Sequence, residues 1–139
     1  MVCVRLLNPS RSSAKIVTVK VIDASVAAAI LFVENEADMA MSMIDDADLV
    51  APRLLPFELA NVAVTKIRRH PEDRRKIVEG LNRSKAMGIR LQEAPETEAY
   101  ELALALNLSA YDASYLWLSK QIEAELLTFD KRLAAAARR

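Results

Sequence analysis

Short apolar runs alternate with amphipathic stretches along most of this chain. Residues 16–22 are rich in Val and Ile, with Lys20 as the only charge, which is typical of a buried strand. The same pattern predicts further short strands over residues 49–51, 89–91 and 125–129. Helices are predicted over residues 24–32, 36–46, 54–69, 71–87, 95–106, 110–123 and 131–138. Strands that alternate with helices predict an α/β fold, with a central parallel sheet covered by helices on both faces.

The N-terminal residues break this pattern. Asn8, Pro9 and the Ser-rich residues 10–13 interrupt any period, so we predict that residues 1–16 are a tail before a domain over residues 17–139. One interpretation of this tail is that it is disordered, and another is that the chain start is assigned too early. A length of 139 residues suits one domain, and neither an internal repeat nor a second domain is evident.

Composition narrows the class of protein. Hydrophobic residues make up 53% and charged residues 27%, as in a soluble globular protein. Cys3 is the only cysteine, which excludes an intrachain disulfide and suits the cytoplasm. No apolar run approaches the roughly 20 residues that span a membrane. Gly80 and Gly88 are too few for a glycine-rich loop that binds phosphate.

Acidic residues stand where a parallel sheet builds a site. Asp23 follows the first predicted strand and Asp130 follows the last, and sites in open parallel sheets form beyond the carboxyl ends of the strands. Glu58 lies on the apolar stripe of a predicted helix, where an unpaired carboxylate costs several kcal/mol. Asp112 opens another helix among aromatic residues.

Each acid also has a purely structural interpretation. Asp23 and Asp130 could cap the helices that follow them, and Ser109 with Asp112 matches a capping box. Glu58 could pair with a distant Lys or Arg. If the carboxylates converge instead, their repulsion raises their pKa values, and a divalent cation would neutralise them. Oxygen ligands suit Mg²⁺ or Mn²⁺, and such a site can hydrolyse phosphodiesters.

Four short motifs resemble those of PIN domains in order and spacing. They are VIDASV at residues 21–26, PFELAN at 56–61, AYDASY at 110–115 and LTFDKRL at 127–133. The resemblance covers residues 17–137, and among small single-domain members it is to VapC-type toxins. The chain stops soon after its last predicted helix, where members of this family usually add an edge strand. The presence of a fifth strand is therefore left open.

The resemblance implies a fold and an activity. The fold would be a three-layer α/β/α sandwich around a parallel sheet of four to five strands. The activity would be Mg²⁺- or Mn²⁺-dependent cleavage of single-stranded or structured RNA. Asp23, Glu58, Asp112 and Asp130 would form an acidic quartet. In this quartet Asp23 and Asp112 would be the main metal ligands, completed by Glu58 and Asp130.

The resemblance further implies supporting residues and partners. Ser25, Thr128 and Asn61 would hydrogen-bond the acids or bound water, although capping and helix–backbone bonds explain these side chains equally well. A homodimer is implied, as is a cognate antitoxin whose C-terminal segment occupies the active-site groove. The protein would be the toxin component of a toxin–antitoxin pair.

Basic residues cluster in one quarter of the chain, although the 19 Lys and Arg balance the 19 Asp and Glu overall. They are Lys66, Arg68, Arg69, Arg74, Arg75, Lys76, Arg83, Lys85 and Arg90. Our hypothesis is that this helical arm follows the RNA backbone, mainly through Arg68, Arg69, Arg74, Arg75 and Lys76. An ordinary solvated helical surface is an equally good interpretation.

Three other functions compete with the nuclease. A phospho-acceptor receiver domain would have an adjacent acidic pair, but Ile22 precedes Asp23. A haloacid-dehalogenase-type phosphatase would have a second acid where Ser25 stands. A catalytically silent PIN-like binding module is the third alternative, and the presence of the whole quartet argues against it.

Overall fold

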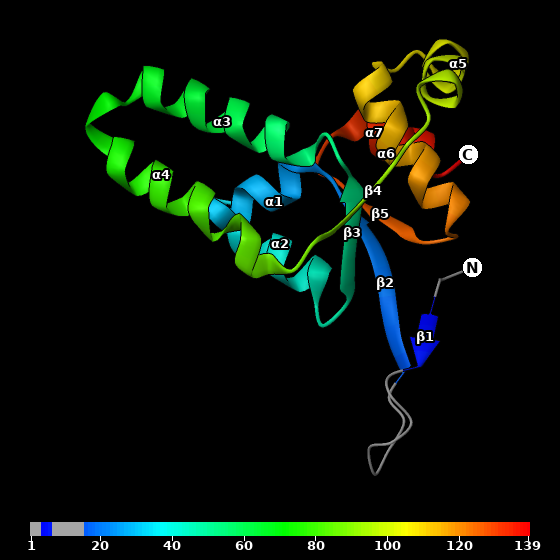
Figure 1. The fold of residues 1–139 in the computed structure, drawn as a ribbon, viewed down its shortest axis with the longest axis horizontal. Coiled ribbons are helices and arrows are strands. Elements are labelled where there is room, and N and C mark those ends of the chain that lie inside the picture. The colour runs from blue at the N-terminus through cyan, green and yellow to red at the C-terminus, as the bar shows by residue number, and fades with distance from the viewer. Residues whose placement is uncertain (1–3, 7–15) are drawn as a thin grey trace.

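A computed structural model describes residues 4–6 and 16–139 of the chain (Figure 1). Its central sheet contains the parallel strands β2 (Ile16–Ile22), β3 (Asp48–Pro52), β4 (Arg90–Gln92) and β5 (Glu125–Leu127). β2 and β3 lie in the middle, with β5 beside β2 and β4 beside β3. The predicted parallel sheet is therefore confirmed. The carboxyl ends of these four strands all lie at the same edge of the sheet.

A fifth strand comes from the N-terminal segment. β1 (Val4–Leu6) pairs antiparallel with the start of β2, so that Leu6 lies opposite Ile16. β5 pairs only with residues 20–22 of the longer β2, and β1 pairs with the residues that precede them. The predicted tail is therefore wrong at residues 4–6 and at Ile16. The rest of the predicted tail, residues 1–3 and 7–15, lies outside the described residues.

Helices cover both faces of the sheet, which confirms the three-layer α/β/α architecture (Figure 1). One face carries α1 (Ala24–Leu31), α2 (Ala37–Ile44), α3 (Leu55–Arg69) and α4 (Arg74–Asn82). The other carries α5 (Glu96–Leu106), α6 (Ala110–Gln121) and α7 (Lys131–Ala137). In the described residues, no helix combines the length and the apolar character that crossing a membrane requires.

Helices α3 and α4 form an arm that projects from the sheet (Figure 1). The single helix predicted over residues 71–87 is divided into η1 (Pro71–Asp73), α4 and η2 (Arg83–Met87). Gly88 ends this segment at φ 66°, the left-handed conformation that favours glycine. The predicted stop at Gly88 is correct, but the segment predicted as one helix begins and ends in short 3-10 helices.

The arm is held against the end of α1. A Cβ on Gly80 would lie 2.6 Å from the carbonyl oxygen of Leu31, so only glycine lets the two backbones approach this closely. Arg83 donates a hydrogen bond of 2.9 Å from Nη2 to the same oxygen. Lys66 adds an ion pair of 2.5 Å with Glu34. These contacts assign Lys66 and Arg83 to anchoring the arm.

The core positions the elements that carry the acids. Val21 and Ile22 of β2 and Val26 of α1 are fully buried around the junction that contains Asp23. A smaller apolar cluster joins α6 to α7 through Leu116 and Leu133. Each such side chain stabilises the fold by about 1.5–3 kcal/mol. The strand ends and helix starts that bear acids are therefore rigid.

Candidate active site

Asp23 occupies the junction between β2 and α1. Its backbone N–H donates to the carbonyl oxygen of Leu127 at 3.1 Å, which places the ends of β2 and β5 side by side. Its Oδ1 accepts hydrogen bonds from the backbone N–H groups of Ser25 at 2.9 Å and Val26 at 3.2 Å. The residue is 6% exposed. Asp23 thus caps α1, as one interpretation of the sequence proposed, while its carboxylate stays at the edge of the sheet.

Two hydroxyl groups fix the Asp23 carboxylate. Ser25 Oγ donates to Oδ1 at 2.6 Å, and Thr128 Oγ1 donates to Oδ2 at 2.5 Å. The same two hydroxyl oxygens also accept hydrogen bonds from the backbone after β5. Ser25 Oγ accepts from the N–H of Phe129, and Thr128 Oγ1 accepts from the N–H of Asp130, each at 3.0 Å. Ser25 and Thr128 therefore join the two strand ends and orient the carboxylate between them.

Glu58 lies in the first turn of α3 and faces the sheet edge. The hydroxyl of Tyr115, on α6, donates to Glu58 Oε1 at 2.6 Å. This bond takes the place of the Lys or Arg that could have paired with Glu58, because no such ion pair of Glu58 occurs in the described residues. Sequence reasoning missed Tyr115. The available signal was its position three residues after Asp112, on the same face of the helix.

Asp112 and Asp130 complete the arrangement from two helix starts. Ser109 caps α6 by accepting the N–H of Asp112 at 3.0 Å, and Asp130 caps α7 by accepting the N–H of Leu133 at 2.9 Å. The capping interpretations of Ser109 and Asp130 are therefore correct. Capping and clustering are compatible, because the caps determine where these carboxylates stand.

The electrostatics show that the carboxylates are neighbours. Burial is the main cause of a raised pKa at Asp23, which its hydrogen bonds oppose. Burial also raises the pKa of Glu58, and the charges of Asp112 and Asp23 raise it further. The pKa of Asp112 is raised by burial and then by Asp130 and Asp23, against the attraction of Arg132. The quartet therefore repels itself across one shared site.

This donor set suits a hard divalent cation. The site offers carboxylate oxygens, carries excess negative charge and gains one opposing cation from the protein, Arg132 near Asp112. No three acids of the quartet, all of them described residues, bring ligand atoms within 4.8 Å of one another. In the described residues, the one set of three potential ligands within 4.8 Å is His70, Glu72 and Asp73, all exposed near the tip of the arm. The acidic quartet and the exposed group of His70, Glu72 and Asp73 are therefore two candidate metal sites, which an experiment must distinguish.

Comparison with known proteins identifies the family. The family model of the PIN domain matches residues 20–139. The chain belongs to the PIN-domain family. It is 30% identical over 119 residues to Ribonuclease VapC3 of Pyrobaculum aerophilum. The alignment covers 82% of this chain and 91% of that protein. This confirms the resemblance carried by the four motifs, and it sets aside the receiver-domain and phosphatase interpretations.

A solved structure supports the same fold. The crystal structure of PAE2754 from Pyrobaculum aerophilum matches with a TM-score of 0.70 at 23% identity, over 86% of this chain and 84% of that one. At this level of identity the match speaks for the architecture alone. The PIN fold of this chain is thus found both by its sequence and by its three-dimensional arrangement.

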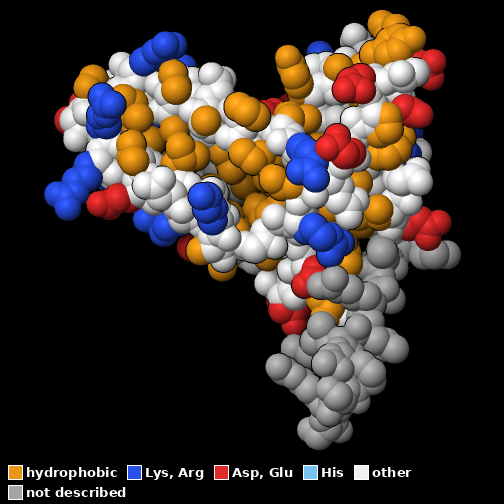
Figure 2. All heavy atoms as spheres, in the orientation of Figure 1, with side chains coloured by type: hydrophobic (Ala, Val, Ile, Leu, Met, Phe, Trp, Pro, Cys, Tyr) orange, Lys and Arg blue, Asp and Glu red, His pale blue; other side chains and the backbone are white. Residues whose placement is uncertain are grey.

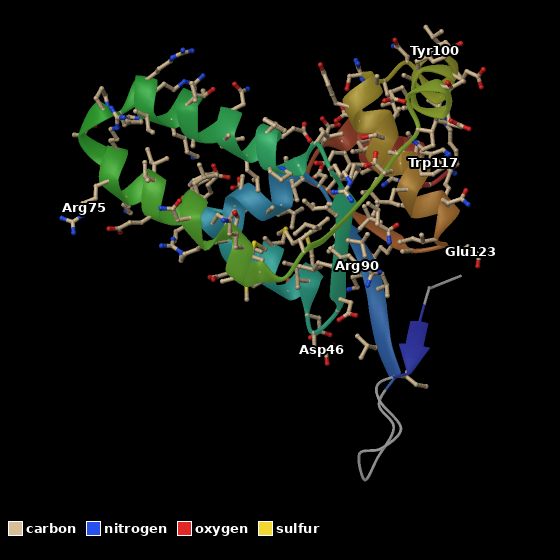
Figure 3. All side chains as sticks on the ribbon, in the orientation of Figure 1. Asp46, Arg75, Arg90, Tyr100, Trp117 and Glu123 are labelled. Carbon is tan, nitrogen blue, oxygen red and sulfur yellow. The ribbon has the colours of Figure 1, made fainter. Side chains whose placement is uncertain are left out.

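The remaining predicted residues of this PIN domain lie outside the quartet. Asn61 is exposed on α3 and lines an open cavity of about 460 Å³ together with Glu58. The basic residues Arg68, Arg69, Arg74, Arg75 and Lys76 are all exposed where α3 ends and α4 begins. Figure 3 shows Arg75 at the far end of the arm. Arg68 is ten positions after Glu58 on α3, roughly 15 Å along the helix axis.

Proposed function

We propose that this PIN domain is a metal-dependent endoribonuclease and the toxin of a toxin–antitoxin pair. The observation that carries the proposal is the shared site of Asp23, Glu58 and Asp112. Burial raises the pKa of all three carboxyl groups, and repulsion by neighbouring carboxylates raises the pKa of Glu58 and Asp112 further. The name of the similar protein, Ribonuclease VapC3, supports RNA as the substrate.

The quartet fits Mg²⁺ or Mn²⁺. Asp23 and Asp112 would be the main ligands, with Glu58 and Asp130 completing one or two sites. A bound divalent ion supplies an activated water and stabilises the charge on the phosphate. The protein's own groups prepare this site: Ser25 and Thr128 orient the Asp23 carboxylate, and Tyr115 holds Glu58. Asn61, which lines the neighbouring cavity with Glu58, would hydrogen-bond bound water or substrate.

The arm is proposed to bind RNA away from the cut. Arg68, Arg69, Arg74, Arg75 and Lys76 would contact phosphates several nucleotides from the carboxylates, because the tip of the arm is separated from them by most of α3. Lys66 and Arg83 are excluded from this role, since both hold the arm in place.

Protein partners are part of the proposal. Met39 and Met41 on α2 and Tyr100 and Leu104 on α5 are exposed, which supports a protein–protein interface on this cytoplasmic toxin. We propose a homodimer, and an antitoxin whose segment occupies the active-site groove. Size-exclusion chromatography with light scattering tests the dimer, and co-purification with the product of the neighbouring gene tests the antitoxin.

The decisive experiment is cleavage of RNA with Mg²⁺ or Mn²⁺, with and without EDTA. We expect cutting only with the ion, and loss of cutting in Asp23→Asn. Asp38→Asn is the matched control, since Asp38 is an exposed acid on α2, outside the quartet. Equal cutting by Asp23→Asn would refute the role of Asp23. Absence of cutting on every RNA would favour the silent binding module.

A further inference from the structure

Two aromatic side chains stand exposed beside the quartet. Phe57 is 81% exposed and Tyr111 is 66% exposed. Each directly precedes an acid, Phe57 before Glu58 and Tyr111 before Asp112. Burial of large aromatic side chains stabilises a fold strongly. Packing within the protein therefore does not account for two solvent-exposed aromatic side chains at one site.

Both aromatic side chains line one cavity. This is the open cavity of about 460 Å³, whose other lining residues are Ala24, Leu54, Glu58, Asn61 and Val62. It thus combines aromatic and aliphatic walls with a carboxylate and an amide. Figure 2 shows this side of the molecule hollowed between the arm and the lobe of α5 and α6, with hydrophobic side chains along both sides of the hollow.

Tyr111 also borders a second cavity. A neighbouring cavity of about 430 Å³ shares Tyr111 and Leu54 with the first. It adds Tyr100, Glu96 and the ion pair of Arg53 with Glu93. The Tyr111 ring therefore stands between two adjoining spaces. Phe57 and Tyr111 thus both line the space beside Glu58.

We propose that Phe57 and Tyr111 are the side chains that stack on unpaired nucleobases next to the scissile phosphate. This rests on the proposed ribonuclease function. Glu58 lines the first cavity, so a phosphodiester bound at the quartet would have this cavity and its two aromatic side chains beside it. Bases in a duplex have both faces covered by their neighbours, whereas unpaired bases can stack on aromatic side chains. The Asn61 amide can bond a base edge, because it offers both donors and an acceptor.

Binding of a short single-stranded RNA tests the proposal. All variants are made in the Asp23→Asn background with Mg²⁺ present, and fluorescence anisotropy measures the affinity. Phe57→Ala and Tyr111→Ala should each weaken binding roughly 10-fold to 100-fold. Phe57→Tyr and Tyr111→Phe should retain it, because the stacking face remains. Ile16→Ala is the control: Ile16 is 64% exposed and lines neither cavity, and its loss should change nothing.

An abasic substrate separates stacking from a structural effect. When the nucleotides next to the cut lack their bases, the parent protein should bind as weakly as the alanine variants, and Phe57→Ala should cause no further loss. A loss of the same size on intact and abasic RNA would overturn the inference. So would equal affinity of the parent protein for single-stranded RNA and for a duplex of the same sequence.

The outcome is distinguishable from that of the proposed function. If the wild-type protein cuts no RNA but the abasic test holds, the nuclease proposal fails and the stacking pair remains. If it cuts RNA and both alanine variants bind normally, the stacking inference fails alone. If these variants instead lose only the affinity for an apolar antitoxin peptide, the cavity belongs to a protein partner and the inference is overturned.

Discussion

Tyr115 and Glu58 lie 57 positions apart in the chain, and the Tyr115 hydroxyl donates a hydrogen bond of 2.6 Å to the Glu58 carboxylate. The Tyr115 side chain is 1% exposed, and its pKa is raised by burial and by the charge of Glu58. The phenol therefore stays protonated and remains a donor. This bond ties α3 to α6, the two helices that bring Glu58 and Asp112 to the site.

Removing this hydroxyl should make cleavage more sensitive to acid. The Tyr115 bond lowers the pKa of Glu58 against the burial that raises it, so Tyr115→Phe should raise the Glu58 pKa further. The acidic limb of the kcat/KM profile should then move to higher pH, with a fall of roughly 10-fold on that limb for each unit of pKa. Ser42→Ala, which removes an exposed hydroxyl on α2, is the control. An unmoved profile would show that Glu58 does not need this donor.

Without metal, the quartet should destabilise the fold as pH rises. The folded-state pKa of Asp112 is raised above 3.8, so the folded protein binds its proton more tightly than the unfolded chain. Stability should therefore fall as pH climbs from about 4 through that raised value. Asp112→Asn should flatten this decline, measured as Tm in EDTA between pH 4 and pH 8. A decline of equal slope in wild type and variant would contradict the repulsion. Asp38→Asn should leave the slope unchanged.

Divalent metal should reverse this loss, and the site it occupies can be identified. At 100 times its dissociation constant, a ligand of the folded state adds about 2.7 kcal/mol of stability. We expect Mn²⁺ to raise Tm in the wild type and in His70→Ala, and to leave Tm unchanged in Asp112→Asn. If His70→Ala removes the effect and Asp112→Asn keeps it, the exposed group of His70, Glu72 and Asp73 is the metal site.

Reversing charge at the tip of the arm should weaken RNA binding. Arg74→Glu with Arg75→Glu removes the cations of two exposed residues that open α4. Affinity should fall, and the slope of log affinity against log salt should decrease by about 0.7 for each lost phosphate contact. Lys120→Glu with Arg138→Glu, two exposed basic residues on the opposite layer, is the matched control. Equal salt slopes for both pairs would mean that the arm is only a solvated surface.

Much of the fold was predictable because local pattern and packing agree. The buried run at Val21 and Ile22 marks the central strand, and the Asp that ends it must start a helix. The position of Asp130 followed from the same logic at the last strand. These features depend on neighbours within a few residues, which is the range over which apolar periodicity and capping are informative.

The parts that were missed depend on distant partners. Residues 4–6 form a strand only because β2 offers a free edge there, and nothing within the segment itself signals that edge. Tyr115 has the sequence surroundings of an ordinary core aromatic residue, and its role appears only when α6 faces α3. The predicted helix over residues 71–87 also breaks at Arg83, whose side chain donates to the Leu31 carbonyl, a partner outside that segment.

Helix α1 acts as a spacer of fixed length. Asp23 caps its first turn, and the Leu31 carbonyl at its last residue receives both the close approach of Gly80 and the guanidinium of Arg83. Its 8 residues extend about 12 Å. The length of α1 therefore fixes the separation between the carboxylates and the base of the arm, and the tip of the arm lies further out. An oligonucleotide too short to extend from the carboxylates to the tip should still be cleaved but should bind more weakly.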